Sequence, residues 1–148
     1  MSEETLQVFI DGVVRYFRHT SHKEVEVGTP YLVENDNPAA FDYTGIIGIS
    51  GPTRGCVYFT ASRILLKHLL LSLGEGDTCD ENLSDLVGEV ANTISGNARS
   101  EFGQEFMISV PVVISGPPSN IHLPQKLRSY VIPIYWKAYS AAVVICLS

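Results

Sequence analysis

The sequence predicts an α+β fold, with a mostly antiparallel sheet packed against two long helices plus an N-terminal helix. Apolar residues recur at helical spacing in three segments. Runs of strand-like segments, separated by turn-forming residues, come before and after the pair of long helices. The chain has 148 residues, enough to bury a core, so we expect a single domain over residues 1–148.

A helix and an extended segment open the chain. Residues 5–19 place apolar side chains at helical spacing, which predicts a first helix. Residues 24–35 then have the pattern of an extended segment, with Gly28 and Pro30 as breaks. A polar loop follows over residues 35–43.

A hairpin and a second helix come next. Residues 44–50 and 55–61 flank a Gly-Pro-Thr-Arg turn and predict two antiparallel strands. Residues 62–73 predict a helix with Thr60 or Ser62 as its N-cap. Apolar residues occupy much of its surface, so we expect this helix to be deeply buried.

The third helix is predicted over residues 83–103, with Asn82 or Ser84 as N-cap and Gly103 just beyond its last turn. One broad arc of its surface is apolar and should face the core. The arc consists of Leu83, Leu86, Val87, Val90, Ala91, Ile94, Ala98 and Phe102.

Strands complete the predicted fold. Residues 106–115 alternate, and Pro111 within them suggests a bulge or an edge position. The residues expected on one face are Phe106, Ile108, Val110, Val112 and Ile114. Residues 129–136 and 140–148 look like an antiparallel pair joined near Lys137. The second of these strands is apolar enough to be either internal or part of a dimer interface.

Composition and charge exclude several classes of protein. The net charge is −6 and only ten residues are Lys or Arg, which argues against nucleic acid as the main partner. No apolar run reaches the length of a membrane span, and the N-terminus lacks a signal-peptide pattern. Cys56, Cys79 and Cys146 form no C-x-x-C motif and suggest reduced thiols. We therefore expect a cytoplasmic protein.

The polar face of the third helix carries an unusual stripe of Asp85, Glu89, Asn92, Gly96 and Arg99. Glu89 and Asn92 lie one turn apart on it. Asn is a mediocre residue for a helix interior, and Gly costs roughly 1 kcal/mol relative to Ala there. From the residues alone, the stripe is equally consistent with a solvated face and with a binding face.

A family resemblance bears on that choice. The segment DLVGEVAN matches the D/S-x-x-x-E-x-x-N signature of the CheC/CheX chemotaxis phosphatases, with Asp85, Glu89 and Asn92 in its three places. The resemblance extends over residues 44–116, including the glycine-punctuated hairpin before the second helix.

The number of signatures separates two types within that family. CheC-type members carry the signature on two helices, but TASRILLKHLLLSL contains no Glu-x-x-Asn. The chain therefore resembles the single-motif CheX type, whose members tend to be homodimers. The family also has a proline about twenty residues past the asparagine, and Pro111 and Pro117 bracket that spacing.

The resemblance implies dephosphorylation of a CheY-like response regulator, whose phosphorylated aspartate lies beside a Mg²⁺ that the regulator itself carries. No cofactor of the protein's own is then expected. Asn92 would orient the attacking water, since an amide both donates and accepts hydrogen bonds. Glu89 would pair with a lysine of the regulator. Asp85, Gly96 and Arg99 would belong to the docking face.

Other interpretations remain open. A CheX-like or flagellar-switch-like domain could instead bind a regulator or another signalling partner without catalysis. His19 and His22 could form a metal pair, but no matching ligand accompanies them, and no metal site is expected. His68 is expected in the core or at its rim. Trp136 and the nearby tyrosines are expected to serve core or dimer packing rather than a ligand platform.

Overall fold

The computed structural model describes residues 2–117, 121–124 and 127–148, which form three helices and eight strands. In chain order these are α1 (Glu3–Ser21), β1 (Glu26–Val27), β2 (Tyr31–Glu34), β3 (Tyr43–Ser50), β4 (Gly55–Ala61), α2 (Arg63–Ser72), α3 (Asp80–Phe102), β5 (Met107–Ile108), β6 (Val112–Ser115), β7 (Arg128–Trp136) and β8 (Tyr139–Leu147).

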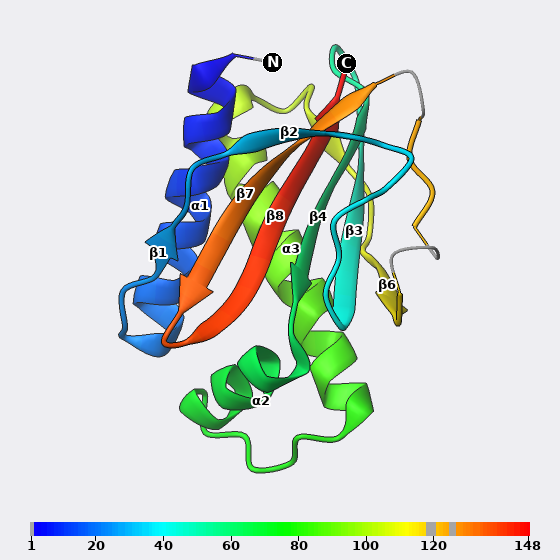
Figure 1. Ribbon diagram of the computed structural model, residues 1–148. Helices are drawn as coiled ribbons and strands as arrows, with labels where there is room; N and C mark the ends of the chain where they lie inside the picture. Colours follow the sequence, from blue (N-terminus) through cyan, green and yellow to red (C-terminus); the bar gives the residue numbers. More distant parts are fainter. Residues whose placement is uncertain (1, 118–120, 125–126) are drawn as a thin grey trace.

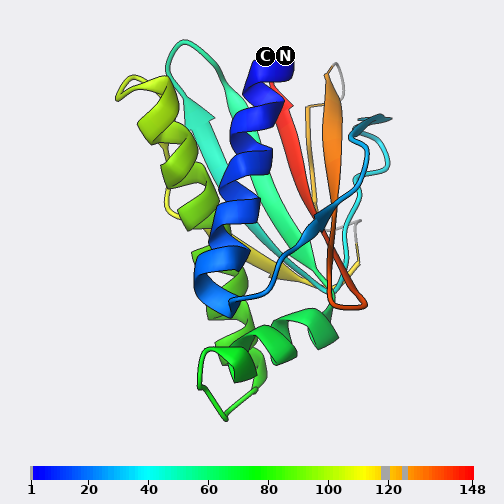
Figure 2. The same cartoon turned by 90° about the vertical axis from the view of Figure 1, so that its left-hand side faces the viewer.

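The eight strands form one antiparallel sheet with the order β1-β7-β8-β4-β3-β5. Strand β2 also pairs with β7, and β6 also pairs with β3, so each edge consists of two short strands in succession. Helices α1 and α3 lie side by side against one face of the sheet, and α2 lies across its lower end (Figures 1 and 2). The predicted fold class is confirmed.

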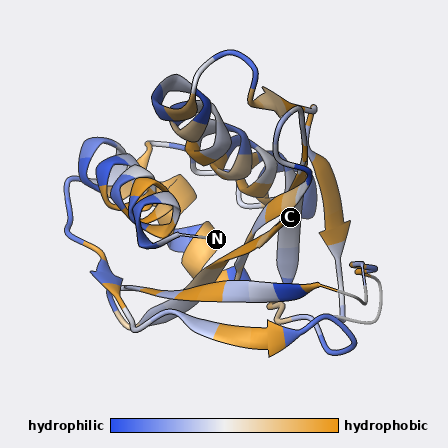
Figure 3. Cartoon of the chain, turned by 90° about the horizontal axis from the view of Figure 1, so that it is seen from above, coloured by the Kyte–Doolittle hydropathy of each residue, from blue (hydrophilic) through white to orange (hydrophobic). Residues whose placement is uncertain are grey.

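The main core lies between the sheet and the two long helices. Phe9 and Phe17 of α1 are fully buried there, together with Trp136 of β7. Seen from above, the helices are apolar on the sides that they turn toward the sheet (Figure 3). A smaller apolar cluster around Tyr58 and Val131 lies on the opposite face of the sheet. Both faces of the central strands are therefore buried.

The helix predictions were mostly confirmed. Helix α1 begins earlier than predicted because Ser2 accepts a hydrogen bond from the Thr5 amide, and α2 is capped by Ser62, one of the two predicted caps. The deep burial expected for α2 was wrong. Because it lies at the lower end of the sheet, one side of it faces solvent. Its exposed apolar residues are Ile64 and Leu71, followed by Leu73 at the C-cap.

The predicted N-cap of α3 was also wrong. The helix starts at Asp80 with Cys79 as its cap residue, rather than with Asn82 or Ser84. The Asn82 amide instead donates to the Asp77 carbonyl. At its other end α3 stops before Gly103, as predicted.

The strand predicted over residues 106–115 is divided into β5 and β6, and both pair with β3 at one edge of the sheet. The edge position suggested by Pro111 is confirmed. The single common face expected for this strand was wrong, since Phe106 and Ile108 pack against the main core whereas Ile114 packs against the smaller cluster on the opposite face. An edge segment broken by proline does not keep one face against the core.

The C-terminal hairpin was predicted correctly. Strands β7 and β8 pair with each other along their length, and the pair nearest the turn is Trp136 with Tyr139. Lys137 has the positive φ that the tight turn requires. Strand β8 pairs with β7 on one side and β4 on the other, so it is internal and offers no free edge for a dimer. Among the residues that the structure describes, no helix is long and apolar enough to cross a bilayer.

Candidate functional site

Helix α3 holds all five predicted site residues on a rigid support. Its buried residues include every member of the predicted apolar arc except Phe102, which is 38% exposed and packs its ring near Phe9 and Phe106. Burial of this arc fixes the rotation of the helix about its axis. The opposite, polar face is consequently held in one orientation.

Two close approaches set the height of α3 above the sheet. A Cβ atom placed on Gly45 of β3 would lie 2.7 Å from the Val87 carbonyl oxygen. A Cβ atom on Gly88 would lie 3.1 Å from Cγ2 of Val113 in β6. Glycine at these two positions lets the backbone of α3 pack directly on β3 and β6.

A polar cluster secures the first turn of α3. The Tyr43 hydroxyl donates to Asp80 at 2.7 Å, and Arg63 of α2 donates both to Asp80 and to the Tyr43 hydroxyl. The hydrogen bond from the Tyr43 hydroxyl, together with the hydrogen bond and positive charge of Arg63, holds the pKa of the Asp80 carboxyl below its usual value. The cluster connects the beginning of α3 with β3 and α2.

The signature residues lie on the exposed face. The side chains of Asp85, Glu89 and Asn92 are all exposed, and no hydrogen bond among the described residues involves them. Around Gly96 there is open space, since nothing lies within 4 Å of the place where a Cβ atom would be. We call the line of Asp85, Glu89, Asn92 and Gly96 the α3 ridge.

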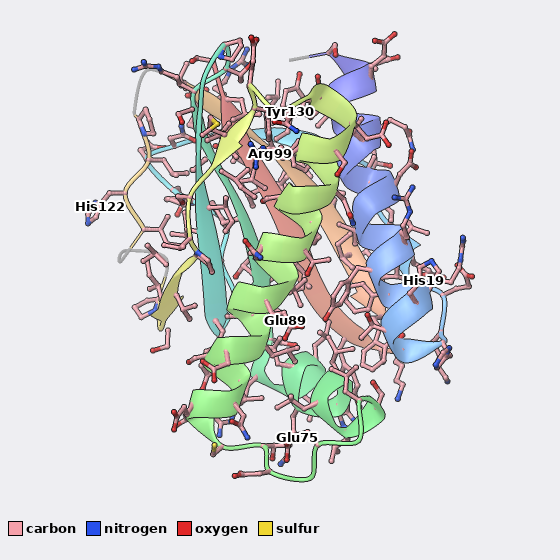
Figure 4. The ribbon with its side chains drawn as sticks, turned by 180° about the vertical axis from the view of Figure 1, so that it is seen from behind. His19, Glu75, Glu89, Arg99, His122 and Tyr130 are labelled. Atoms are coloured by element: carbon pink, nitrogen blue, oxygen red, sulfur yellow. The ribbon has the colours of Figure 1, made fainter. Side chains whose placement is uncertain are left out.

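The ridge has different neighbours on its two sides. Helix α1 runs along one side and the β5–β6 segment along the other, as Figure 4 shows from the helix side of the sheet. Burial of the Tyr16 phenol in α1, with a further contribution from the nearby negative charge of Glu89, raises the pKa of Tyr16 to about 12. Asn92 lies one turn beyond Gly88, the residue that contacts β6.

The Arg99 side chain contacts the segment that follows α3 and does not simply point into solvent. Its Nη2 donates to the Gln104 carbonyl oxygen at 3.2 Å and lies 3.9 Å from the Met107 sulfur. Its Nε is buried without a partner among the described residues. Arg99 thus supports the connection from α3 to β5, and its docking role remains a prediction.

None of the cavities found among the described residues is lined by a residue of the α3 ridge. A cavity of about 440 Å³ lies at the opposite end of α3, lined by residues such as Thr5, Thr53 and Phe102, and includes none of the predicted site residues. No group of three or more His, Cys, Asp or Glu side chains among the described residues could hold a metal ion.

The other predicted candidates lie apart from the ridge. His19 and His22 are exposed at the end of α1. His68 is half-buried and stacks on Tyr139 at a centroid distance of 4.9 Å, as expected for the rim of the core. Trp136 is fully buried and donates its ring N–H to Ser21, which agrees with the packing role expected for it.

Sequence reasoning missed two residues that shape this surface. Gly45 was not singled out, although a glycine within a strand pattern often marks the close approach of another backbone. Tyr16 continues the buried face of α1, but nothing in the sequence indicates that it lies beside Glu89. Both relationships join segments that are far apart in the chain.

Comparisons with known proteins agree on one family. The model of the family described as "Chemotaxis phosphatase CheX" matches residues 43–135. The structure of a CheC-like superfamily protein from Shewanella sp. PV-4 is 28% identical, with a TM-score of 0.87 and coverage of 100% of this chain and 99% of that one. The chemotaxis protein CheX from Vibrio vulnificus is 26% identical, with a TM-score of 0.82 and coverage of 98% and 99%.

A more distant structure is a complex. It is the CheX–CheY–BeF₃–Mg²⁺ complex from Borrelia burgdorferi, in which the matched chain is 21% identical to this one, with a TM-score of 0.79 and 97% coverage of each chain. At that identity it shows the common fold. A comparison with curated proteins gave no match.

Proposed function

The chain belongs to the CheX family of chemotaxis phosphatases, and from this we propose that it hydrolyses the aspartyl phosphate of a CheY-like response regulator. In this proposal the protein works in the cytoplasm as a homodimer and needs no cofactor of its own, because the regulator carries the Mg²⁺. The complex from Borrelia burgdorferi, which contains CheX, CheY and Mg²⁺, supports that class of partner.

One observation carries the proposal: the Asn92 amide is exposed on a helix whose opposite face is locked in the core. An acyl phosphate is already activated, and the regulator supplies the metal that neutralises charge. The remaining task is to place one water in line with the phosphorus. An amide can do so without acting as a base, since its carbonyl accepts a hydrogen bond and its NH₂ donates one.

Glu89 would fix the register of the two proteins. Its carboxylate is exposed about one turn before Asn92 and forms no hydrogen bond with the described residues, so it is available to pair with a regulator lysine. Asp85, Gly96 and Arg99 would border the same docking surface, with Gly96 allowing close approach of the regulator's backbone.

The test is a phosphatase assay with a CheY-like receiver phosphorylated by a small-molecule donor in Mg²⁺. Loss of one positioning group should lower kcat of Asn92→Ala by roughly 10²-fold, equivalent to about 2.7 kcal/mol. Glu89→Ala should weaken both affinity and turnover. Glu26→Ala is the matched control, since it removes the same charge from an exposed position in β1, at the edge of the sheet opposite β5 and β6.

Two results would contradict the proposal. Full activity of Asn92→Ala would remove its assigned role. Binding of several receivers by the wild-type protein without any acceleration of phosphate loss would instead favour the non-catalytic alternative, a domain that docks a regulator and holds it.

A further inference from the structure

The two sides of the α3 ridge differ in chemical character. On the α1 side, a small cavity of about 100 Å³ is lined by Asp11, Arg15, Asn97 and Glu101, so this side is polar and charged. On the other side, residues 106–117 contain no charged residue at all. A partner that covers the ridge therefore meets a charged flank and an apolar flank.

The apolar flank is formed by Met107, Pro111 and Val113, which we call the apolar shelf. Val113 pairs with Gly45, and both belong to the helix-covered side of the sheet, where Val113 and Pro111 approach Gly88. Met107 approaches Arg99 further along α3. The shelf thus follows α3 from Gly88 to Arg99.

Parts of the shelf remain open to solvent. Met107 is 49% exposed and Val113 is 37% exposed, although both adjoin the helix. Exposed apolar side chains grouped beside a predicted binding residue indicate a surface that a partner covers. Asn92 lies along α3 between Gly88, which approaches Pro111 and Val113, and Arg99, which approaches Met107. A partner that covers the shelf would therefore also cover the Asn92 amide.

Charge distinguishes the two possible directions of approach. The partner's phosphoryl group is negative and is repelled by Glu89, which lies on the α1 side. Successive residues are about 100° apart, so Asn92 is displaced by about 60° from Glu89 around the helix axis, toward the shelf. The shelf has no carboxylate and ends near the Arg99 guanidinium. A phosphoryl group is therefore favoured on the shelf side.

We propose that the apolar shelf docks an apolar side chain of the phosphorylated receiver beside its phosphoaspartate, and so orients the phosphoryl group over the β5–β6 side of α3. This inference rests on the proposed function. Burial of the shelf excludes bulk water from one side of Asn92, leaving the amide in contact with the water that it orients. The receiver lysine then lies on the Glu89 side.

Strand β6 offers a matched pair of variants for the test. Val113 faces the helices, whereas its neighbour Val112 pairs with Ile46 on the opposite face of the sheet and is more exposed. Val113→Asp should raise both the KM for the phosphorylated receiver and the Kd for a receiver loaded with beryllofluoride and Mg²⁺ by about tenfold or more, and should also lower kcat, because the phosphoryl group is then less well oriented over Asn92. Val112→Asp should leave both constants unchanged, and Val113→Ile should retain binding.

Each outcome decides a different point. If the wild-type protein is active and Val113→Asp has the same KM and Kd, docking at the apolar shelf is contradicted and the proposed function stands. A wild-type protein that neither binds nor dephosphorylates any receiver overturns both. An equal loss of receiver binding in Val112→Asp and Val113→Asp, accompanied by a lower mass in sedimentation, also contradicts docking at the apolar shelf. In that case β6 is an interface between two copies of the chain. Circular dichroism and thermal unfolding verify that each variant is folded.

Discussion

Gly45 of β3 lies directly beneath the Val87 carbonyl of α3. A Cβ atom at Gly45 would come within 2.7 Å of that oxygen and within 3.2 Å of the Ala91 Cβ. The Val87 oxygen is a backbone atom, so a change of side-chain rotamer cannot relieve the clash. The absence of a side chain at Gly45 therefore determines how closely the helix with the proposed catalytic ridge approaches the sheet.

Gly45→Ala should displace α3 and destabilise the protein by about 1–3 kcal/mol, the usual range for overpacking a core. Chemical denaturation measures the loss, and the phosphatase assay should show lower kcat, because Asn92 moves with its helix. Gly48→Ala is the control: it faces the other side of β3, where the nearest atom to a Cβ would be the Ser109 Oγ at 3.3 Å. Equal stability of the two variants would show that α3 adapts without cost.

Gly96→Ala should affect stability and function in opposite directions. The position is helical and has open space around it, so alanine should stabilise the fold by about 1 kcal/mol through helix propensity. If the receiver's backbone approaches here, the added methyl should raise the KM. Denaturation midpoints and receiver titrations measure the two effects. A more stable variant with unchanged KM would exclude Gly96 from the docking surface.

Local periodicity explains which parts of the fold could be predicted from the sequence. The arc of α3 was recognisable because burial of residues such as Leu86 and Val90 follows the helical repeat directly. The hairpin turn at Lys137 was recognisable from two strand patterns in succession. These features depend on residues close together in the chain.

Features that depend on distant segments could not be predicted. The start of α3 is held by Tyr43 and Arg63, which come from β3 and α2. The exposure of Val110 follows from the edge position of its segment, which alternation alone does not reveal. For the site, the ridge was visible in the sequence, whereas its two contrasting flanks required the packing of α1 and β6 on either side.

The three thiols should react at very different rates. Burial, with a smaller contribution from Cys146 on the neighbouring strand, raises the pKa of Cys56 to about 12. Cys146 is fully buried, while Cys79 is exposed at the cap of α3. At mildly alkaline pH the exposed Cys79 thiol should be alkylated rapidly, the partly buried Cys56 much more slowly, and the fully buried Cys146 only on unfolding. Mass spectrometry would locate the label, and Cys79→Ser should abolish the fast phase. Rapid labelling of Cys56 would contradict its raised pKa.

The pair Tyr16 and Glu89 provides a test of the ridge that needs no partner protein. Burial and the Glu89 charge raise the pKa of Tyr16 from 10.0 to about 12, because both disfavour the phenolate in the folded protein. The resulting stability is fully present below pH 10 and is lost as the pH rises toward 12. Glu89→Gln removes the negative charge and should therefore lower the pKa of Tyr16, so that its phenolate absorbance appears at lower pH. Tyr16→Phe identifies the transition, since that variant lacks it. An unchanged transition in Glu89→Gln would mean that the carboxylate is turned away from α1, and the register assigned to the receiver lysine would have to be revised.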